Sequence, residues 1–146
     1  MSEIRIYVDG ACHPNPGIGG YAFVVVEDDV NLHQYSRRVE DTTNNRMEMS
    51  AIEDALQWVI AECPKELVPR IVIYTDSKYC YNGITHWCDG WERKNWQDVK
   101  NSDIWQNLKR LSELCPHVRY KWVKGHDGDR WNEHVDKLAV SARMAK

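Results

Sequence analysis

The sequence predicts an α/β protein with a five-stranded mixed β-sheet, in which three antiparallel strands are followed by parallel strands and α-helices flank the sheet. Three observations predict this fold. Residues 4–9 alternate apolar and polar side chains, as a half-buried strand does. Residues 47–60 repeat apolar side chains at intervals of three and four, as an amphipathic helix does. Residues 71–74 are apolar without alternation, which is typical of a strand covered on both faces in a parallel sheet.

The first half of the chain predicts an antiparallel meander. After the strand over residues 4–9, the glycines and prolines of residues 10–20 predict a loop. Strands are predicted over residues 21–26 and 31–39, because a short polar break separates them at hairpin distance.

Helices and strands alternate in the second half. The long helix begins near Asn44 and ends before Pro64, and its buried stripe is expected to comprise Met47, Ala51, Ile52, Ala55, Leu56, Val59 and Ile60. A strand over residues 70–74 and a helix starting at Ser77 follow. Residues 85–101 predict an irregular or protruding segment. The remaining elements are a helix capped by Ser102 or Asp103 with Ile104, Leu108, Leu111 and Leu114 buried, a strand over residues 118–123, and a last helix with Trp131, Val135, Leu138, Ala139 and Ala142 inward.

Length and composition favour one domain over residues 1–146, large enough to bury roughly 70% of its unfolded surface. The five cysteines form no Cys-x-x-Cys pair, which argues against a disulfide framework or a structural zinc site. No leader-like or membrane-spanning stretch is recognisable, so we expect a cytoplasmic protein, a monomer without an obligate protein partner.

Four carboxylates occupy positions that require an explanation. Asp9 and Asp76 follow two predicted strands, at the sheet edge where α/β proteins bind ligands. Glu48 and Asp136 lie on the inward edges of two predicted helices. Each acid taken alone is also explained as an ordinary helix cap or turn residue. Together they predict a carboxylate cluster that selects Mg²⁺, with Mn²⁺ as a substitute, and that holds two ions ~4 Å apart for phosphodiester hydrolysis.

Ordered motifs extend across nearly the whole chain. They are YVDGAC at residues 7–12 with NPG at 15–17, TTNNRME at 42–48, YTDS at 74–77, and WVKGH at 122–126 with Asn132-Glu133 before Asp136. From about residue 4 to residue 145, this pattern closely resembles bacterial ribonuclease H type 1. The resemblance implies a ribonuclease H-like fold and an endonuclease that cuts the RNA strand of an RNA/DNA hybrid with two Mg²⁺ ions, leaving 3′-hydroxyl and 5′-phosphate ends.

The resemblance also implies roles for the catalytic residues. Asp9 would bridge both ions, Glu48 and Asp76 would complete the ion on the leaving-group side, and Asp136 would hold the ion that carries the attacking water. His126 matches a loop histidine thought to assist proton transfer or product departure.

Further positions match substrate-contacting residues of the family. Asn15, Asn44 and Asn45 match residues near the minor groove, where amides can recognise the 2′-hydroxyl that distinguishes RNA from DNA. Each is also a common loop or helix-cap residue. For the DNA strand, Trp87 and Trp91 match aromatics that lie against deoxyribose, and Thr43 and Asn101 match a phosphate pocket. Cys12 matches a cysteine beside the active site that is not a nucleophile, while Trp105 and Trp122 are expected in the core.

Three departures from the family predict weaker hybrid binding. The arginine of the phosphate pocket is replaced by Asp41, for which Arg37, Arg38 or Arg46 are the candidate substitutes. The basic protrusion is shortened to residues 91–100. The histidine loop carries two additional acids, Asp127 and Asp129.

The net charge of −3 excludes a strongly basic, non-specific binder of nucleic acid. It does not exclude a hybrid substrate, because two divalent cations add four positive charges and change the net charge to +1. Two alternatives remain at this point. A DNA nuclease or strand-transfer enzyme of the same fold would lack the TTNN block and the tryptophan-bearing segment, and an inactive hybrid-binding module would lack a carboxylate.

Overall fold

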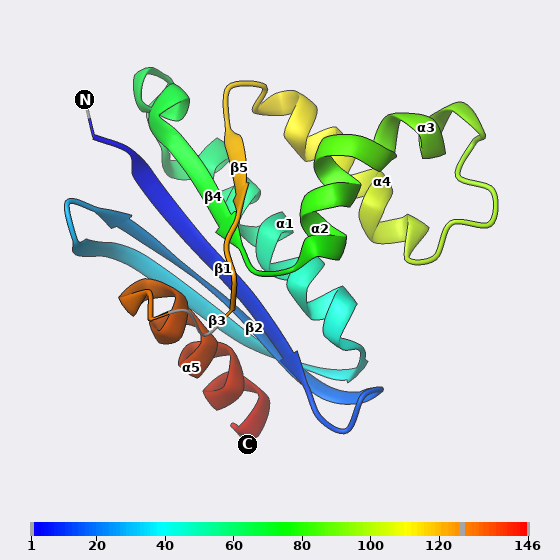
Figure 1. Cartoon of the computed structure of the whole chain (residues 1–146), viewed down its shortest axis with the longest axis horizontal. Helices are drawn as coiled ribbons and strands as arrows, with labels where there is room; N and C mark the ends of the chain where they lie inside the picture. Colours follow the sequence, from blue (N-terminus) through cyan, green and yellow to red (C-terminus); the bar gives the residue numbers. More distant parts are fainter. Residues whose placement is uncertain (1, 126–127, 146) are drawn as a thin grey trace.

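The computed structural model describes residues 2–125 and 128–145. Its sheet has the strand order β3-β2-β1-β4-β5 (Figure 1). The strands are β1 (Ile4–Cys12), β2 (Gly17–Glu27), β3 (Val30–Thr42), β4 (Ile71–Thr75) and β5 (Arg119–Trp122). β1, β2 and β3 pair antiparallel, whereas β4 pairs parallel with both β1 and β5. The predicted five-stranded mixed sheet is therefore confirmed.

Helices cover both faces of this sheet. They are α1 (Asn44–Glu62), the 3₁₀ segment η1 (Lys65–Arg70), α2 (Lys78–Asn82), the π-helical turn η2 (Gly83–Trp87), α3 (Cys88–Arg93), α4 (Ser102–Leu114) and α5 (Arg130–Met144). α5 packs across β1, β2 and β3 on one face, and α1 packs on β1 and β2 and against α4 (Figure 1). No helix within the described residues has the combined length and apolarity that crossing a bilayer requires.

Two apolar clusters hold these layers together. The larger lies on the α1 face and includes Ile6, Val8, Phe23, Leu56 and Trp105. The smaller lies under α5, where Tyr7, Val24, Tyr74, Val135 and Ala139 are buried. Because β1 contributes alternate residues to each cluster, its register fixes both layers at once.

Two glycines let the helices approach the sheet closely. A Cβ at Gly10, in β1, would lie 2.4 Å from the backbone nitrogen of Glu48 in α1. A Cβ at Gly20, in β2, would lie 2.4 Å from the carbonyl oxygen of Ala139 in α5. These contacts bring α1 and α5 against opposite faces of neighbouring strands, and both helices carry a predicted metal ligand.

Several sequence-based boundaries were wrong. The predicted loop over residues 10–20 is shorter, because Cys12 pairs with Gly19 and both strands continue into it. The predicted irregular segment 85–101 is helical through η2 and α3 as far as Arg93. Asn101, in a left-handed conformation, precedes α4 in place of the predicted cap Ser102 or Asp103. Two side chains expected to be buried, Ile60 and Leu114, are exposed because each lies near the end of its helix, past the neighbouring layer.

Candidate metal centre and nucleic-acid interface

Four carboxylates from four elements meet at the carboxyl end of β1 and β4. Asp9 lies in β1, Glu48 just after the first turn of α1 and Asp76 directly after β4, and one carboxylate oxygen from each lies within 4.8 Å of the other two. Asp136, in α5, lines the same pocket and lies close enough to Asp9 to raise the pKa of Asp9. All four line one pocket of about 520 Å³. The structure thus brings together the four acids that the sequence predicted.

Without a cation, the electrostatics of this pocket disfavour the simultaneous ionisation of its carboxyl groups. Burial raises the pKa of Asp9 to about 8, with the charges of Asp76 and Asp136 adding to the shift. Burial also raises the pKa of Glu48 well above its usual value, and Asp9 and Asp76 raise it further. Oε2 of Glu48 is buried and has no hydrogen-bond partner among the residues described. An oxygen-only site with an unpaired buried carboxylate oxygen fits a hard divalent cation.

Backbone contacts orient two of these acids. The backbone N–H of Gly10 donates to Oδ1 of Asp9 at 2.9 Å. The indole Nε1 of Trp122 donates to the carbonyl oxygen of Asp76 at 3.0 Å, and Val123 N–H donates to the Thr75 carbonyl at 2.9 Å. The end of β5 therefore fixes the backbone at Thr75 and Asp76, where β4 ends. Trp122, predicted in the core, is half-buried and makes this contact instead.

A second pocket of about 400 Å³ opens beside the carboxylates. Five residues predicted to contact substrate line it together with Pro16 and Lys100: Asn15, Thr43, Asn44, Asn45 and Asn101. They come from three separate segments, the β1–β2 connection, the start of α1 and the residue before α4. The side chain of Asn15 accepts a hydrogen bond from the backbone N–H of Asn44 at 3.1 Å, which joins the first two segments.

The charge in this second pocket comes from a residue that the sequence analysis did not place there. Lys100 lines the pocket, whereas Asp41 is not among its lining residues. Arg46 donates to Oδ1 of Asn101 at 3.3 Å and pairs with Asp103 at 2.8 Å. Of the three arginines considered as substitutes, Arg46 contacts a pocket residue, while Arg38 pairs with Glu40. Lys100 directly precedes Asn101, which the sequence analysis had placed in the phosphate pocket, and this adjacency could have predicted Lys100 there.

The comparison with protein-family models decides the family. The ribonuclease H model, described as RNase H, matches residues 1–144. The chain belongs to the ribonuclease H family.

Curated members of the family match over nearly the full chain. The sequence is 44% identical to the ribonuclease H of Rickettsia bellii over 150 residues, covering 99% of this chain and 91% of that protein. It is 41% identical to the ribonuclease H of Neorickettsia sennetsu, covering 95% and 91%. Among solved structures, LC9-RNase H1, described as a type 1 RNase H with the type 2 active-site motif, superposes with a TM-score of 0.78 at 25% identity, covering 99% of this chain and 74% of that one. LC11-RNase H1, solved with an RNA/DNA hybrid, shares the fold at a TM-score of 0.74 and 19% identity, covering 97% of each chain.

The tryptophans of this ribonuclease H family member occupy different environments. Trp87 is 42% exposed and Trp91 is half-buried, with their ring centroids 5.7 Å apart. Trp91 also packs on Trp105, at 5.2 Å between centroids, and Trp105 is fully buried as predicted. Trp87 therefore presents an aromatic surface that Trp91 and the core support.

Four further residues singled out by the sequence analysis need comment. Cys12 is buried, lines the carboxylate pocket and donates from Sγ to the Thr42 carbonyl at 3.4 Å. Asp129 caps α5 by accepting from the backbone N–H groups of Trp131 and Asn132, and it also accepts from the Tyr7 hydroxyl. The carboxylate of Asp129 is thus bound to the N-terminal backbone of α5. His126 and Asp127 lie outside the residues described.

The sequence analysis missed one cation of the carboxylate pocket. Arg143 lines this pocket together with Val140, and its guanidinium donates to the His13 carbonyl at 3.3 Å. Arg143 and Val140 follow Asp136 by seven and four residues, so all three share one face of α5. That helical spacing was the available signal.

Proposed function

We propose that the chain is an endonuclease that hydrolyses the RNA strand of RNA/DNA hybrids and leaves 3′-hydroxyl and 5′-phosphate ends. One observation carries the proposal: a four-carboxylate cluster lies next to a pocket lined by four asparagines and a lysine. The cluster suits phosphodiester hydrolysis, and the pocket offers amides of both hydrogen-bonding polarities.

The positions of the acids suggest how each one acts. Asp9 lies within 4.8 Å of both Glu48 and Asp76 and also feels the charge of Asp136, so it is the acid that two cations would share. Glu48 and Asp76 would complete one cation site, and Asp136 the other. Divalent cations held here, Mg²⁺ with Mn²⁺ as a substitute, supply the charge that activates the attacking water and stabilises the leaving oxygen. The neighbouring cations of the cluster would also hold the carboxylates ionised at neutral pH.

Substrate discrimination would rest on the second pocket. A 2′-hydroxyl both donates and accepts hydrogen bonds, and the amides of Asn15, Asn44 and Asn45 can satisfy both roles. Lys100 and the hydroxyl of Thr43 would hold a phosphate of the DNA strand, with Asn101 positioned by Arg46. Trp87 would lie against a deoxyribose, supported by Trp91.

The family supports the reaction and the partner. Curated relatives at 41–44% identity carry the name ribonuclease H, and LC11-RNase H1 was solved with an RNA/DNA hybrid. We further propose that the chain acts in the cytoplasm as a monomeric, single catalytic domain without an obligate protein partner. His126 would assist proton transfer or product departure, as in the family.

A cleavage assay tests the proposal. Labelled RNA/DNA hybrid and DNA duplex are incubated separately with Mg²⁺, Mn²⁺ or EDTA. We expect cleavage of the RNA strand alone, and only with a divalent cation. Asp9→Asn should remove at least about 10³-fold of the rate, the scale of losing metal or electrostatic stabilisation.

The matched control is Asp28→Asn, which makes the same chemical change in an exposed turn where Asp28 has a φ of 50° that asparagine tolerates. Comparable cutting of both duplexes would transfer the assignment to a DNA nuclease. An inactive wild-type protein that still binds the hybrid would instead support a binding module.

A further inference from the structure

Exposed cations gather on the α5 face of the sheet, over β4 and β5, where α5 itself does not reach. In β5, Arg119 pairs with Val72 and Lys121 pairs with Tyr74, and in β1, Arg5 also pairs with Val72. This register places the three cations on one face of the sheet. α5 packs on β1, β2 and β3, and Figure 1 shows it away from β4 and β5. The side chain of Arg119 is 59% exposed, and Lys121 is exposed as well.

Aromatic contacts hold two of these cations in place. The guanidinium of Arg5 lies 5.3 Å from the centre of the Tyr74 ring, and Nζ of Lys121 lies 5.6 Å from it. Tyr74 itself is buried and stacks on Tyr7. A cation over a fixed ring loses less conformational freedom when it binds an anion, because part of that freedom is already lost.

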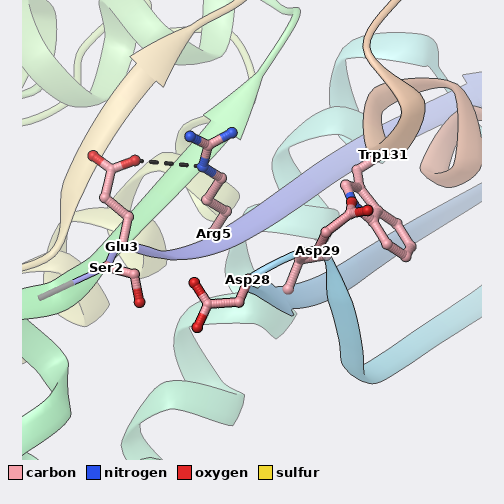
Figure 2. Close-up of a pocket in the computed structure, with 7 residues that line it drawn as sticks. Ser2, Glu3, Arg5, Asp28, Asp29 and Trp131 are labelled. Carbon is pink, nitrogen blue, oxygen red and sulfur yellow. Dashed lines mark hydrogen bonds and ion pairs between the residues drawn. The ribbon is translucent and has the colours of Figure 1, made fainter.

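Acids neutralise one side of this group. Glu3 lies 3.5 Å from Arg5 and 4.0 Å from Arg119. Figure 2 shows the Glu3–Arg5 pair at a cavity of about 530 Å³ that Asp28, Asp29 and Trp131 also line. The single charge of Glu3 is shared between Arg5 and Arg119, so a net positive charge remains along β5, at Lys121 above all.

The cations are aligned with the carboxylate cluster. Tyr7 lies two residues before Asp9 on the same face of β1, and its partner Tyr74 lies two residues before Asp76, which directly follows β4. Successive positions on one face of a strand are about 6.6 Å apart. The row with Lys121 is thus about 7 Å from the row of catalytic acids, and the row with Arg119 about 13 Å. Lys124, exposed after β5, precedes Gly125, where a Cβ would lie 3.0 Å from Oδ2 of Asp76.

We infer that Arg119, Lys121 and Lys124, here called the β5 surface, bind backbone phosphates of the substrate on one side of the cleavage site. The identity of that substrate as a hybrid rests on the proposed function. Nucleic acid is favoured over an acidic peptide because the β5 surface continues the line of the catalytic strands. The ~13 Å from the row with Arg119 to the catalytic acids also corresponds to about four steps of a nucleic acid at ~3.4 Å per step.

The test compares the salt dependence of binding. A labelled hybrid of about 20 base pairs, more than four steps long, is titrated with the double variant Arg119→Gln/Lys121→Gln in EDTA, by fluorescence anisotropy. The matched control, Lys65→Gln/Arg110→Gln, removes two exposed cations from η1 and α4, whose neighbours Leu67 and Leu108 pack on the α1 face. Because binding is read without cleavage, an inactive protein would contradict the proposed function and leave this test intact.

Each phosphate contact contributes about 0.9 to the slope of log affinity against log salt. We expect the slope of the double variant to be lower by about 1.8, so that wild type loses about tenfold more affinity than the variant between about 50 and about 200 mM salt. The control pair should keep the wild-type slope. A second double variant, Arg119→Lys/Lys121→Arg, keeps both positive charges. It should retain most of the wild-type slope. An unchanged slope in the double variant, or an equal loss in the control, would overturn the inference and leave the β5 surface to an acidic partner.

Discussion

The hydroxyl of Tyr7 donates a hydrogen bond to Oδ2 of Asp129 at 3.2 Å, across 122 residues of sequence. Tyr7 lies in the middle of β1, and Asp129 is the N-terminal cap of α5. The contact thus joins the central strand to the helix that carries Asp136. Burial raises the pKa of the Tyr7 hydroxyl, which therefore remains protonated and donates at neutral pH.

The cap of α5 and the hydrogen bond that joins it to β1 should each contribute measurably to the stability of the protein. Asp129→Ala leaves two backbone N–H groups without their acceptor, and we expect a loss of about 1 kcal/mol, in the range of 0.5–2 for helix caps. Tyr7→Phe should cost about 1 kcal/mol. Urea unfolding of the single and double variants measures both, and the effects should be less than additive because the residues share one contact. Asp129→Asn, which keeps a capping oxygen, serves as the control.

The stability of the metal-free protein should fall as pH rises from about 4 to about 8. Burial raises the pKa of Asp9 from 3.8 to about 8, so the folded state holds a proton that the unfolded state releases in this range. Glu48 shifts in the same direction. Thermal unfolding in EDTA at several pH values measures this, and the stabilisation by Mg²⁺ should grow with pH. In Asp9→Asn the pH dependence should shrink, with the metal-free variant more stable than wild type at pH 8 by at least about 1 kcal/mol, one pKa unit being 1.36. A flat profile in wild type would contradict the assignment.

Lys100 should matter more for hybrid binding than Asp41. Lys100→Ala removes the cation of the asparagine pocket, and we expect KM to rise about fivefold, equivalent to ~1 kcal/mol, with kcat nearly unchanged. Asp41→Asn should change KM much less, because Asp41 does not line the pocket and asparagine tolerates its φ of 52°. Steady-state kinetics on one hybrid distinguishes the two. A larger effect at Asp41 would show that its charge acts on the phosphate after all.

Gly20→Ala should be among the most damaging single substitutions. Its Cβ would lie 2.4 Å from one backbone atom of α5 and 2.5 Å from another, so α5 must move, and overpacking of this kind costs about 1–3 kcal/mol or more. Gly90→Ala is the control. In α3, the atom nearest to its new Cβ is the flexible end of Arg93 at 3.6 Å, and alanine favours the helix by up to about 1 kcal/mol. Chemical denaturation of both variants should give opposite signs.

The sequence predicted what its local periodicity encodes. The apolar alternation and the three-and-four repeat established the strands and α1, and the ends of two strands and two helix faces indicated the four acids. Contacts between segments distant in sequence were not predictable. The pairing of Cys12 with Gly19 extended two strands into the expected loop. The cluster of Trp87, Trp91 and Trp105 supports helices in a segment without apolar repeats. The placement of Lys100 depends on how α4 packs against the start of α1.

The close approach at Gly10 and Gly20 has a thermodynamic consequence. Glu48 and Asp136 belong to helices that pack on opposite faces of the sheet and so on different apolar clusters. Two cations that share Asp9, one held with Glu48 and the other with Asp136, would bind together only when both clusters are assembled. Binding therefore couples the two layers energetically, and partial opening of either α1 or α5 also costs the free energy of metal binding. The metal-loaded protein should thus unfold more cooperatively than the metal-free protein, because the ligands of one metal centre come from helices on opposite faces of the sheet.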